Sequence, residues 1–258
     1  MTAHDAPLPT LIDGARAAMS RADWPAAFGH WEHIRLRHPD HAEAQLNAAL
    51  ALLQLGHVAQ ADALLLRGAT AFPDHFQLAL ESARNAFRSG DWAAAQERWR
   101  AVMDRFPDSP DAFAGVGASL QLLGRLDDAE PVLAEAVGRF PDHIDIAIEW
   151  ARVPHRRADW PTALARWSDV VRRFPDHPEG YAGVGVALQL LGRLDEADAL
   201  LRGAADRFPT HSGIAIEYAR IPHRRADWQA ALQRWQAVIE RCPDAPDGPI
   251  GAGIALRQ

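Results

Sequence analysis

The stretch PEGYAGVGVALQLLGRLDEADALLRGAADRFPTH, residues 178–211, contains the pattern that decides the fold. Its apolar residues recur at helical spacing in two blocks. The blocks consist of Tyr181, Val184, Gly185, Leu188 and of Ala197, Leu200, Leu201, Ala204. Each block predicts an amphipathic helix, and the glycine between them, Gly192, allows a tight turn. The stretch therefore predicts a helical hairpin.

This hairpin recurs along the chain with a fixed period. Its closing proline returns every 34 residues without insertion, at Pro39, Pro73, Pro107, Pro141, Pro175, Pro209 and Pro243. A constant period of this length is typical of a repeat protein, in which each repeat packs on its neighbours instead of around a central core. The composition agrees, because alanine is abundant and tyrosine, which favours strands, occurs only twice.

The repeat resembles the tetratricopeptide repeat (TPR) family. The residues that match its pattern in order are Tyr181, Val184, Gly185, Leu188, Gly192, Ala197, Leu201, Ala204 and Pro209. The preceding copy matches with Phe113, Val116, Gly117, Leu120, Gly124, Ala129, Leu133, Ala136 and Pro141. The resemblance implies an all-α, right-handed superhelical solenoid of antiparallel helix hairpins, with about 7.5 repeats. It also implies that the first helices line a concave groove, where such proteins bind extended peptides.

Three segments follow from this period. Residues 1–7 form an N-terminal tail, residues 8–245 form seven repeats, and residues 246–258 form the first helix of a truncated eighth repeat. Because this last helix is apolar, we expect it to be covered either by a following part of a longer protein or by a second copy of the chain.

The charge and the termini exclude several classes of function. A formal charge of −7 and a pI near 5.9 argue against a nucleic-acid partner. The N-terminus lacks a signal peptide, and no segment has the apolar length of a membrane span. We therefore predict a cytoplasmic protein, and its Arg- and Ala-rich repeats resemble bacterial ones. The single cysteine, Cys242, stands where other repeats have Phe and is expected to fill a small apolar pocket.

A longer period of 68 residues overlies the repeat. Alternate repeats carry an Asp-Trp pair and a second tryptophan seven residues later, as in Asp159-Trp160 and Trp167. These tryptophans match family positions that pack between helices, so we interpret them as core residues and not as a sugar-stacking platform.

The same alternate repeats carry a charged stripe on their first helix, at helical spacing and displaced from the apolar stripe. The predicted ligand-binding residues of the groove are Glu81, Arg84, Arg88, Glu149, Arg152, His155, Arg156, Glu217, Arg220, His223 and Arg224. With the adjacent Arg157 and Arg225, the stripes hold eight arginines against three glutamates, which predicts a basic groove that suits carboxylates or phosphates. The alternative is a solvated face, with Glu149 paired to Arg152, that merely reflects duplication.

Two further expectations concern the first helices. Gly115 and Gly183 are expected to leave shallow pockets between the charged ridges, since no packing reason for them is evident. Pro154 and Pro222 are expected to kink or end their helices and thereby redirect the His-Arg-Arg that follows each.

The sequence predicts no catalytic residue, no metal site and no cofactor. The histidines at 41, 75, 143, 177 and 211 recur once per repeat and are interpreted as turn residues, and no nucleophile elbow or P-loop occurs. We predict a non-catalytic scaffold that binds an acidic peptide or protein segment in its groove, without nucleic acid and without membrane insertion. The alternative is a targeting or substrate-presenting arm of a larger glycosyltransferase- or sulfotransferase-like enzyme.

Overall fold

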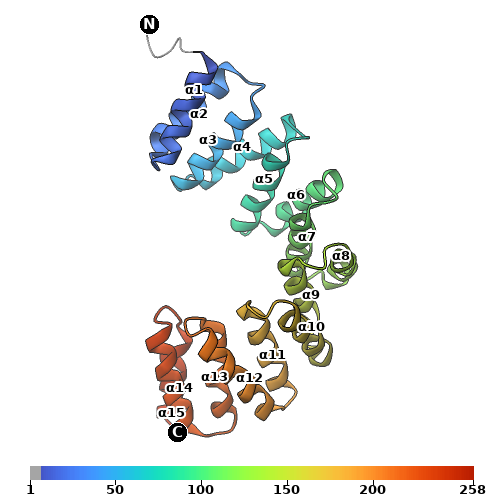
Figure 1. The fold of residues 1–258 in the computed structure, drawn as a ribbon, viewed down its shortest axis with the longest axis vertical. Helices are drawn as coiled ribbons and strands as arrows, with labels where there is room; N and C mark the ends of the chain where they lie inside the picture. The colour runs from blue at the N-terminus through green and yellow to red at the C-terminus, as the bar shows by residue number, and fades with distance from the viewer. Residues whose placement is uncertain (1–6) are drawn as a thin grey trace. The chain divides into compact units, whose positions relative to one another are not determined.

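A computed structural model describes residues 7–258, and within them every regular element is a helix. Figure 1 shows these helices following one another as hairpins. Their bounds are α1 (Leu8–Ser20), α2 (Trp24–Arg37), α3 (Ala42–Gln54), α4 (Val58–Ala71), α5 (Phe76–Arg88), α6 (Trp92–Arg105), α7 (Pro110–Leu122), α8 (Leu126–Arg139), α9 (Ile144–Arg156), α10 (Trp160–Arg173), α11 (Pro178–Leu190), α12 (Leu194–Arg207), α13 (Ser212–Arg224), α14 (Trp228–Arg241) and α15 (Asp247–Leu256). The predicted all-α class is confirmed, and the predicted tail 1–7 lies, except for Pro7, outside the described residues.

Local signals fix the turns within each hairpin. Gly192 sits between α11 and α12 with a φ of +75°, the left-handed conformation that a glycine adopts without cost. In the alternate repeats the aspartate of the Asp-Trp pair caps the second helix. Asp159, for example, accepts a hydrogen bond from the backbone N–H of Thr162. Sequence periodicity and turn chemistry therefore agree on the same hairpin.

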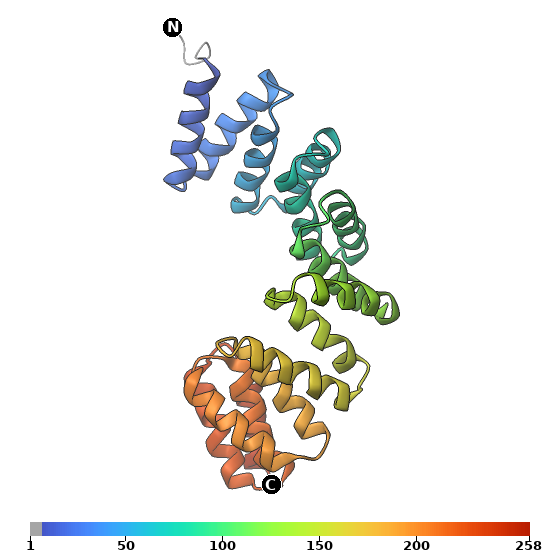
Figure 2. The same cartoon turned by 45° about the vertical axis from the view of Figure 1, so that its right-hand side comes forward.

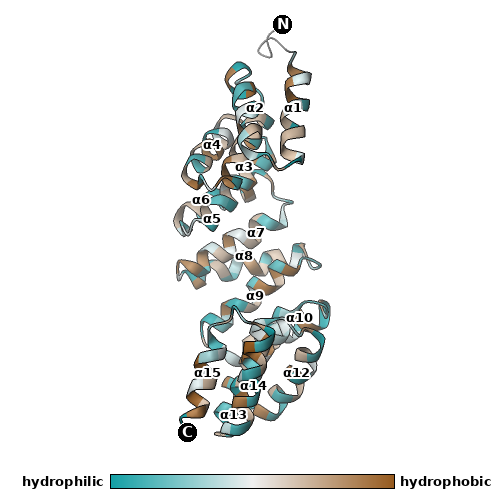
Figure 3. Ribbon diagram, turned by 90° about the vertical axis from the view of Figure 1, so that its left-hand side faces the viewer, coloured by the Kyte–Doolittle hydropathy of each residue, from teal (hydrophilic) through white to brown (hydrophobic). Residues whose placement is uncertain are grey.

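The chain forms two compact units, Met1–Val132 and Leu133–Gln258. Within the first unit, each helix from α1 to α7 packs on the next one in the chain. Its buried residues include Trp31, Leu65 and Leu78, which share one apolar cluster. Figure 3 shows how hydropathy alternates along single helices, as expected of elements that bury one face.

In the second unit α9 to α15 also pack in chain order, as two views show (Figures 1 and 2). The first helix of each hairpin additionally contacts the first helix of the next, from α9 through α11 and α13 to α15. We call the surface that these four helices share the first-helix face. Cys242 packs among Ala219, Ala231 and Val238 in the apolar cluster at the base of α14, as predicted.

The expectation for Pro154 and Pro222 was wrong in part: α9 runs to Arg156 and α13 to Arg224 with the proline inside. Proline cannot donate to the carbonyl four residues earlier, but here an arginine of the next helix replaces the missing donor. Arg166 Nη1 donates to the Trp150 carbonyl at 3.0 Å, and Arg234 Nη1 donates to the Tyr218 carbonyl at 3.0 Å. The freed carbonyl is satisfied, so the helix continues.

The expectation for Gly115 and Gly183 was wrong in its reason, because both glycines have a packing role, although Gly183 does line a cavity as expected. A Cβ at Gly115 would stand 2.3 Å from Trp99 Cδ2, and one at Gly183 would stand 2.3 Å from Trp167 Cδ2. Gly251 has the same relation to Trp235. These glycines allow a first helix to lie directly on the indole of the preceding second helix.

No helix in the described part of the chain has both the length and the apolar character needed to cross a membrane.

Candidate functional site

The charged stripes of α9 and α13 lie on the first-helix face of the second unit. On α9, Arg152 extends its guanidinium between two carboxylates, Glu149 on its own helix and Glu179 in the first turn of α11. The distances are 2.5 Å from Nη1 to Glu149 Oε1 and 3.1 Å from Nη2 to Glu179 Oε2. This fork links two consecutive first helices across the stack.

The same fork recurs 68 residues later. Arg220 of α13 binds Glu217 at 2.5 Å and Asp247, in the first turn of α15, at 3.1 Å. Burial raises the pKa of Glu217, while Arg220 and Gln189 oppose that rise. The intrahelical pairing that the alternative interpretation expected therefore exists, and Arg152 and Arg220 act as bridges between helices.

Beside each fork is a cavity. The cavity between α9 and α11 has a volume of about 410 Å³, and the one between α13 and α15 has about 340 Å³. We call them the α9–α11 pocket and the α13–α15 pocket. Both are lined by the same kinds of residue: Arg152, His155, Arg156, Trp167, Glu179 and Gly183 in one, Arg220, His223, Arg224, Trp235, Asp247 and Gly251 in the other.

Tryptophan and histidine shape each pocket. Trp167 is only 4% exposed and lies under Gly183, so the prediction of a core role holds although the ring also borders the cavity. His155 packs edge-on against Trp160, with ring centroids 5.3 Å apart. Burial first, and then Arg156 and Arg152, lower the pKa of His155. The imidazole is therefore neutral at pH 7 and becomes a cation more readily when an anion lies beside it.

Arg156 is the cation that the pocket leaves available. It is exposed and makes no hydrogen bond or ion pair with any residue from 7 to 258. Its counterpart Arg224 is exposed too and donates from Nε to Gln189 Oε1 at 3.2 Å, which positions its guanidinium at the pocket. Each pocket thus presents an exposed arginine beside a histidine.

The first unit holds the third stripe, on α5. Arg84 again bridges two carboxylates, Glu81 at 3.0 Å and Asp111 of α7 at 3.1 Å. Arg88 lies 3.6 Å from Glu81. Phe87 replaces the histidine and packs edge-on against Trp92 at 5.1 Å. This copy keeps the fork and lacks the titratable group.

The structure corrects the predicted charge of the face. The eight arginines of the stripes meet more than the three predicted carboxylates. Asp195 binds Arg225, and one further carboxylate reaches each fork from the following first helix. These three are Asp111, Glu179 and Asp247. Sequence reasoning missed these three residues. Their signal was present in the sequence, since each follows its fork arginine by the same interval and recurs with the 68-residue period.

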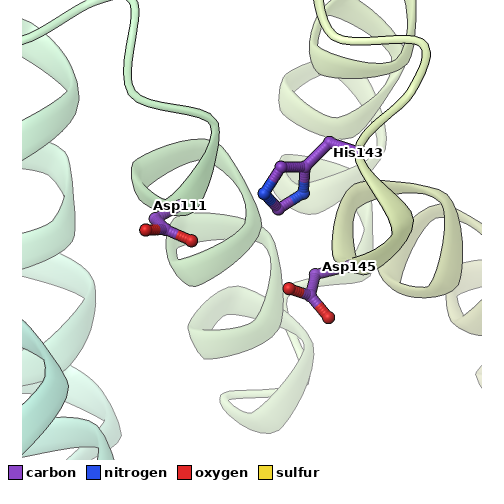
Figure 4. Close-up of side chains that lie close together, drawn as sticks. All are labelled: Asp111, His143 and Asp145. Atoms are coloured by element: carbon purple, nitrogen blue, oxygen red, sulfur yellow. The ribbon is translucent and has the colours of Figure 1, made fainter.

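The histidines interpreted as turn residues stand at the N-termini of first helices. His41, His75 and His211 accept a hydrogen bond at Nδ1 from the backbone N–H three residues later. His143 holds the corresponding position before α9, with Asp145 in the first turn of that helix (Figure 4). His41, His75 and His211 thus cap their helices, and all five histidines stand at helix starts, which confirms their assignment to the turns.

The family model that matches this chain is described as "Tetratricopeptide repeat" and covers residues 12–76, 80–144 and 150–212. The chain belongs to the tetratricopeptide repeat family. Members of this family bind proteins or peptides, generally serve as scaffolds for protein–protein interaction and are typically non-catalytic.

Two solved structures show the same fold. A tetratricopeptide repeat protein from Parabacteroides merdae ATCC 43184 has a TM-score of 0.76 and 11% identity, over 96% of this chain and 98% of its own. YrrB, described as a TPR protein with an unusual peptide-binding site, has a TM-score of 0.55 and 16% identity, over 71% of this chain and 95% of its own. At these identities the likeness concerns the fold alone.

A curated relative is the cellulose synthase operon protein C of Xanthomonas axonopodis pv. citri (strain 306). It is 25% identical over 180 residues, which are 67% of this chain. The matched segment is only 12% of that protein's length.

Proposed function

We propose that this chain is a protein-interaction scaffold whose first-helix face binds an acidic peptide segment. One carboxylate of the ligand enters the α9–α11 pocket and another enters the α13–α15 pocket. The observation that carries this proposal is the recurrence of the whole pocket, with its arginine, histidine, tryptophan and glycine, at the interval of the double repeat.

The pocket chemistry favours a carboxylate over a neutral group. Arg152 and Arg220 are already occupied by two carboxylates each, so the ligand is left with Arg156 and Arg224. A guanidinium offers paired donors in one plane, which match the two oxygens of a carboxylate. A bound carboxylate also favours protonation of the adjacent histidine, which adds a second charge to the contact.

The surrounding shape suits an extended peptide. Ala182, Gly183 and Val186 form a low, small-residue floor in the α9–α11 pocket, and Ile250 and Ile254 line the α13–α15 pocket. Apolar side chains of the ligand can pack on these surfaces, beside Arg156 and Arg224. YrrB, which shares the fold, has a peptide-binding site, and this supports a peptide as the type of ligand.

The decisive experiment removes Arg156 and Arg224 together. The probe is a fluorescein-labelled peptide of six glutamates, with a peptide of six glutamines as its neutral counterpart, and binding is followed by fluorescence polarisation. We expect the R156A/R224A variant to bind the acidic peptide at least about tenfold more weakly, a loss of about 1.4 kcal/mol. Wild-type binding should weaken with added salt, because the contact is partly exposed.

The matched control is the R172A/R202A variant, which loses the same charge from α10 and α12. These arginines are 74% and 63% exposed, and their ion pairs lie within their own helices, so their removal should leave the affinity within about twofold. Equal weakening in both variants would show that only net charge matters. Equal binding of the glutamine peptide would contradict carboxylate recognition.

The second candidate function is that of a repeat arm of a larger enzyme or synthesis complex. The enzyme would resemble a glycosyltransferase or a sulfotransferase. The curated relative favours this function, because it is a cellulose synthase operon protein and the segment that matches this chain is only 12% of that protein's length. The test is to read the gene beyond residue 258. An in-frame catalytic domain supports the arm, and an immediate stop codon contradicts it.

The exposed apolar side chains of α15, including Ile250 at the pocket, belong to the same proposal, as a surface for self-association or for a downstream domain. Ile250 is 63% exposed and Leu256 is 69% exposed, which is unusual for such large apolar residues. If α15 mediates self-association, replacing Ile250 and Leu256 with Gln lowers the solution mass measured by light scattering. An unchanged mass contradicts it.

A further inference from the structure

A cavity of about 360 Å³ lies between α4, α5 and α6 of the first unit, away from the charged stripe of α5. Leu66, Ala69, Ala79, Ala101 and Phe106 form its apolar lining, and Ser82 and Arg98 lie at its inner end. We call it the α4–α6 slot. The second unit has the corresponding place between α12, α13 and α14, so the two can be compared residue by residue.

The arginine at the inner end is anchored in the same way wherever it occurs. Arg98, Arg166 and Arg234 each donate from Nη1 to the carbonyl of the equivalent first-helix residue, at 3.0 Å in every case. The acceptors are the carbonyls of Ser82, Trp150 and Tyr218. The hydrogen bond fixes where the guanidinium stands relative to its first helix.

In the second unit this guanidinium is covered by an aromatic ring. The Arg166 guanidinium carbon lies 3.3 Å from the centroid of the Trp150 ring, and that of Arg234 lies 3.7 Å from the centroid of the Tyr218 ring. Such stacking is attractive because the electron-rich face of the ring meets a cation. In the first unit Ser82 stands at this position, and its side chain is too small to cover Arg98.

The volumes of the two cavities differ because Ser82 is smaller than Tyr218. Where Tyr218 fills the space, the cavity is about 160 Å³, less than half the 360 Å³ of the α4–α6 slot. The rim differs as well. Leu66 is 46% exposed at the slot, whereas Arg202 stands at the equivalent position in α12. The slot is therefore more open and more apolar than its counterpart.

The charge of Arg98 is already balanced. Its two terminal nitrogens bind Asp62, at 2.6 and 2.8 Å, and Asn85 donates to the same carboxylate at 2.8 Å. The hydrogen bonds from Arg98 and Asn85 lower the pKa of the Asp62 carboxyl group, so the Arg98–Asp62 pair stays ionised. An anion would gain little here, but the flat face of the guanidinium suits the quadrupole of an uncharged ring.

We propose that the α4–α6 slot binds an aromatic side chain of a partner protein, which stacks on Arg98 as Trp150 stacks on Arg166. The chain itself shows the chemistry of the occupant, because tryptophan and tyrosine fill the equivalent space in the second unit. The slot involves none of the pocket residues of the proposed acidic-peptide site.

The test uses the whole chain and a blocked amino acid as the probe. N-acetyl-5-fluorotryptophanamide is titrated and followed by 19F NMR, with N-acetyl-trifluoroleucinamide as an apolar, non-aromatic counterpart. We expect saturable binding of the tryptophan probe with a Kd of about 1–10 mM and at least about fivefold weaker binding of the leucine probe. Equal binding of both probes would overturn the proposal.

Variants locate the binding. Ser82→Trp supplies the ring from the chain itself and should abolish binding, whereas Leu36→Arg, at an exposed leucine of α2 outside the slot, should leave the Kd within about twofold. Leu66→Arg, on the exposed rim, copies α12 without altering the buried residues and should weaken binding at least about threefold, which keeps the test valid if Ser82→Trp fails to fold. Unchanged binding in both Ser82→Trp and Leu66→Arg, with the helical circular dichroism retained, would contradict the slot as the site.

Discussion

Helices α5 of the first unit and α13 of the second occupy the same place in the double repeat, yet only part of their surroundings is the same. Both keep the arginine fork, with Arg84 between Glu81 and Asp111 and Arg220 between Glu217 and Asp247. Both also accept a hydrogen bond at one backbone carbonyl from an arginine of the next helix.

The differences concern three other positions of the helix, of which those of Ser82 and Ala86 are buried. Ser82 corresponds to Tyr218, Ala86 to Pro222, and Phe87 to His223. The interactions that join one helix to the next are thus constant, and the side chains beside them vary. Each copy uses the same framework with different neighbouring side chains, for which we propose an aromatic ligand at α5 and an acidic ligand beside α13.

The largest expected effect tests the shared framework. Gly115→Ala and Gly251→Ala each place a Cβ 2.3 Å from an indole atom, of Trp99 and of Trp235. Overpacking should exceed the gain in helix propensity and lower the stability by about 2 kcal/mol in both copies. Urea denaturation measures this.

Gly203→Ala is the matched control, because nothing lies within 4 Å of that glycine in α12. It should raise the stability by up to about 1 kcal/mol. If all three variants behaved alike, the close contact between glycine and tryptophan would be refuted.

The second effect tests the proline difference. Arg234→Gln removes the donor to the Tyr218 carbonyl, which Pro222 cannot replace. Pro222→Ala copies Ala86 of α5 and supplies an N–H. The loss of unfolding free energy caused by Arg234→Gln should then be about 1 kcal/mol smaller in the Pro222→Ala background than in the wild type. Additive losses in this double-mutant cycle would contradict the replacement of the proline donor.

The third effect concerns the turn after each helix. Gly90 follows α5 with a φ of +78°, whereas Ala226 follows α13 with a φ of +57°. A left-handed alanine is strained, so Ala226→Gly should stabilise the chain by about 0.5–1 kcal/mol. Gly90→Ala should destabilise it by a similar amount. Thermal unfolding of both variants measures the pair, and shifts of equal sign would contradict the strain.

The smallest effect depends on pH and uses α9, where burial and two arginines lower the pKa of His155. The unfolded chain binds a proton near pH 6.5 before the folded chain does, so stability is lost as the pH falls below about 6.5. His155→Phe copies Phe87 of α5 and should reduce this loss. Melting temperatures at about pH 7.5 and 5.5 measure the difference, and an identical drop in both proteins would contradict it.

Most of the fold was predictable because its signals are local. The apolar spacing, the glycine of each turn and the Asp-Trp cap lie within single repeats, so periodicity reveals them without knowledge of contacts. The proposed site was harder to predict. The stripes could be located, but the role of Gly183 depends on Trp167, and Gly183 was wrongly interpreted because that contact joins residues of different hairpins.

The repeat, its family, the hairpins and the helical face of the charged stripes could be predicted from the sequence, since all of these follow from the spacing of residues along the chain. The tertiary structure alone decided which groups meet. It brought Glu179 to Arg152, and Asp62 to Arg98 at a separation of 36 residues, and it formed the α4–α6 slot between three helices. Such contacts depend on how one hairpin packs against the next, and packing is a property of shapes and distances that periodicity does not contain.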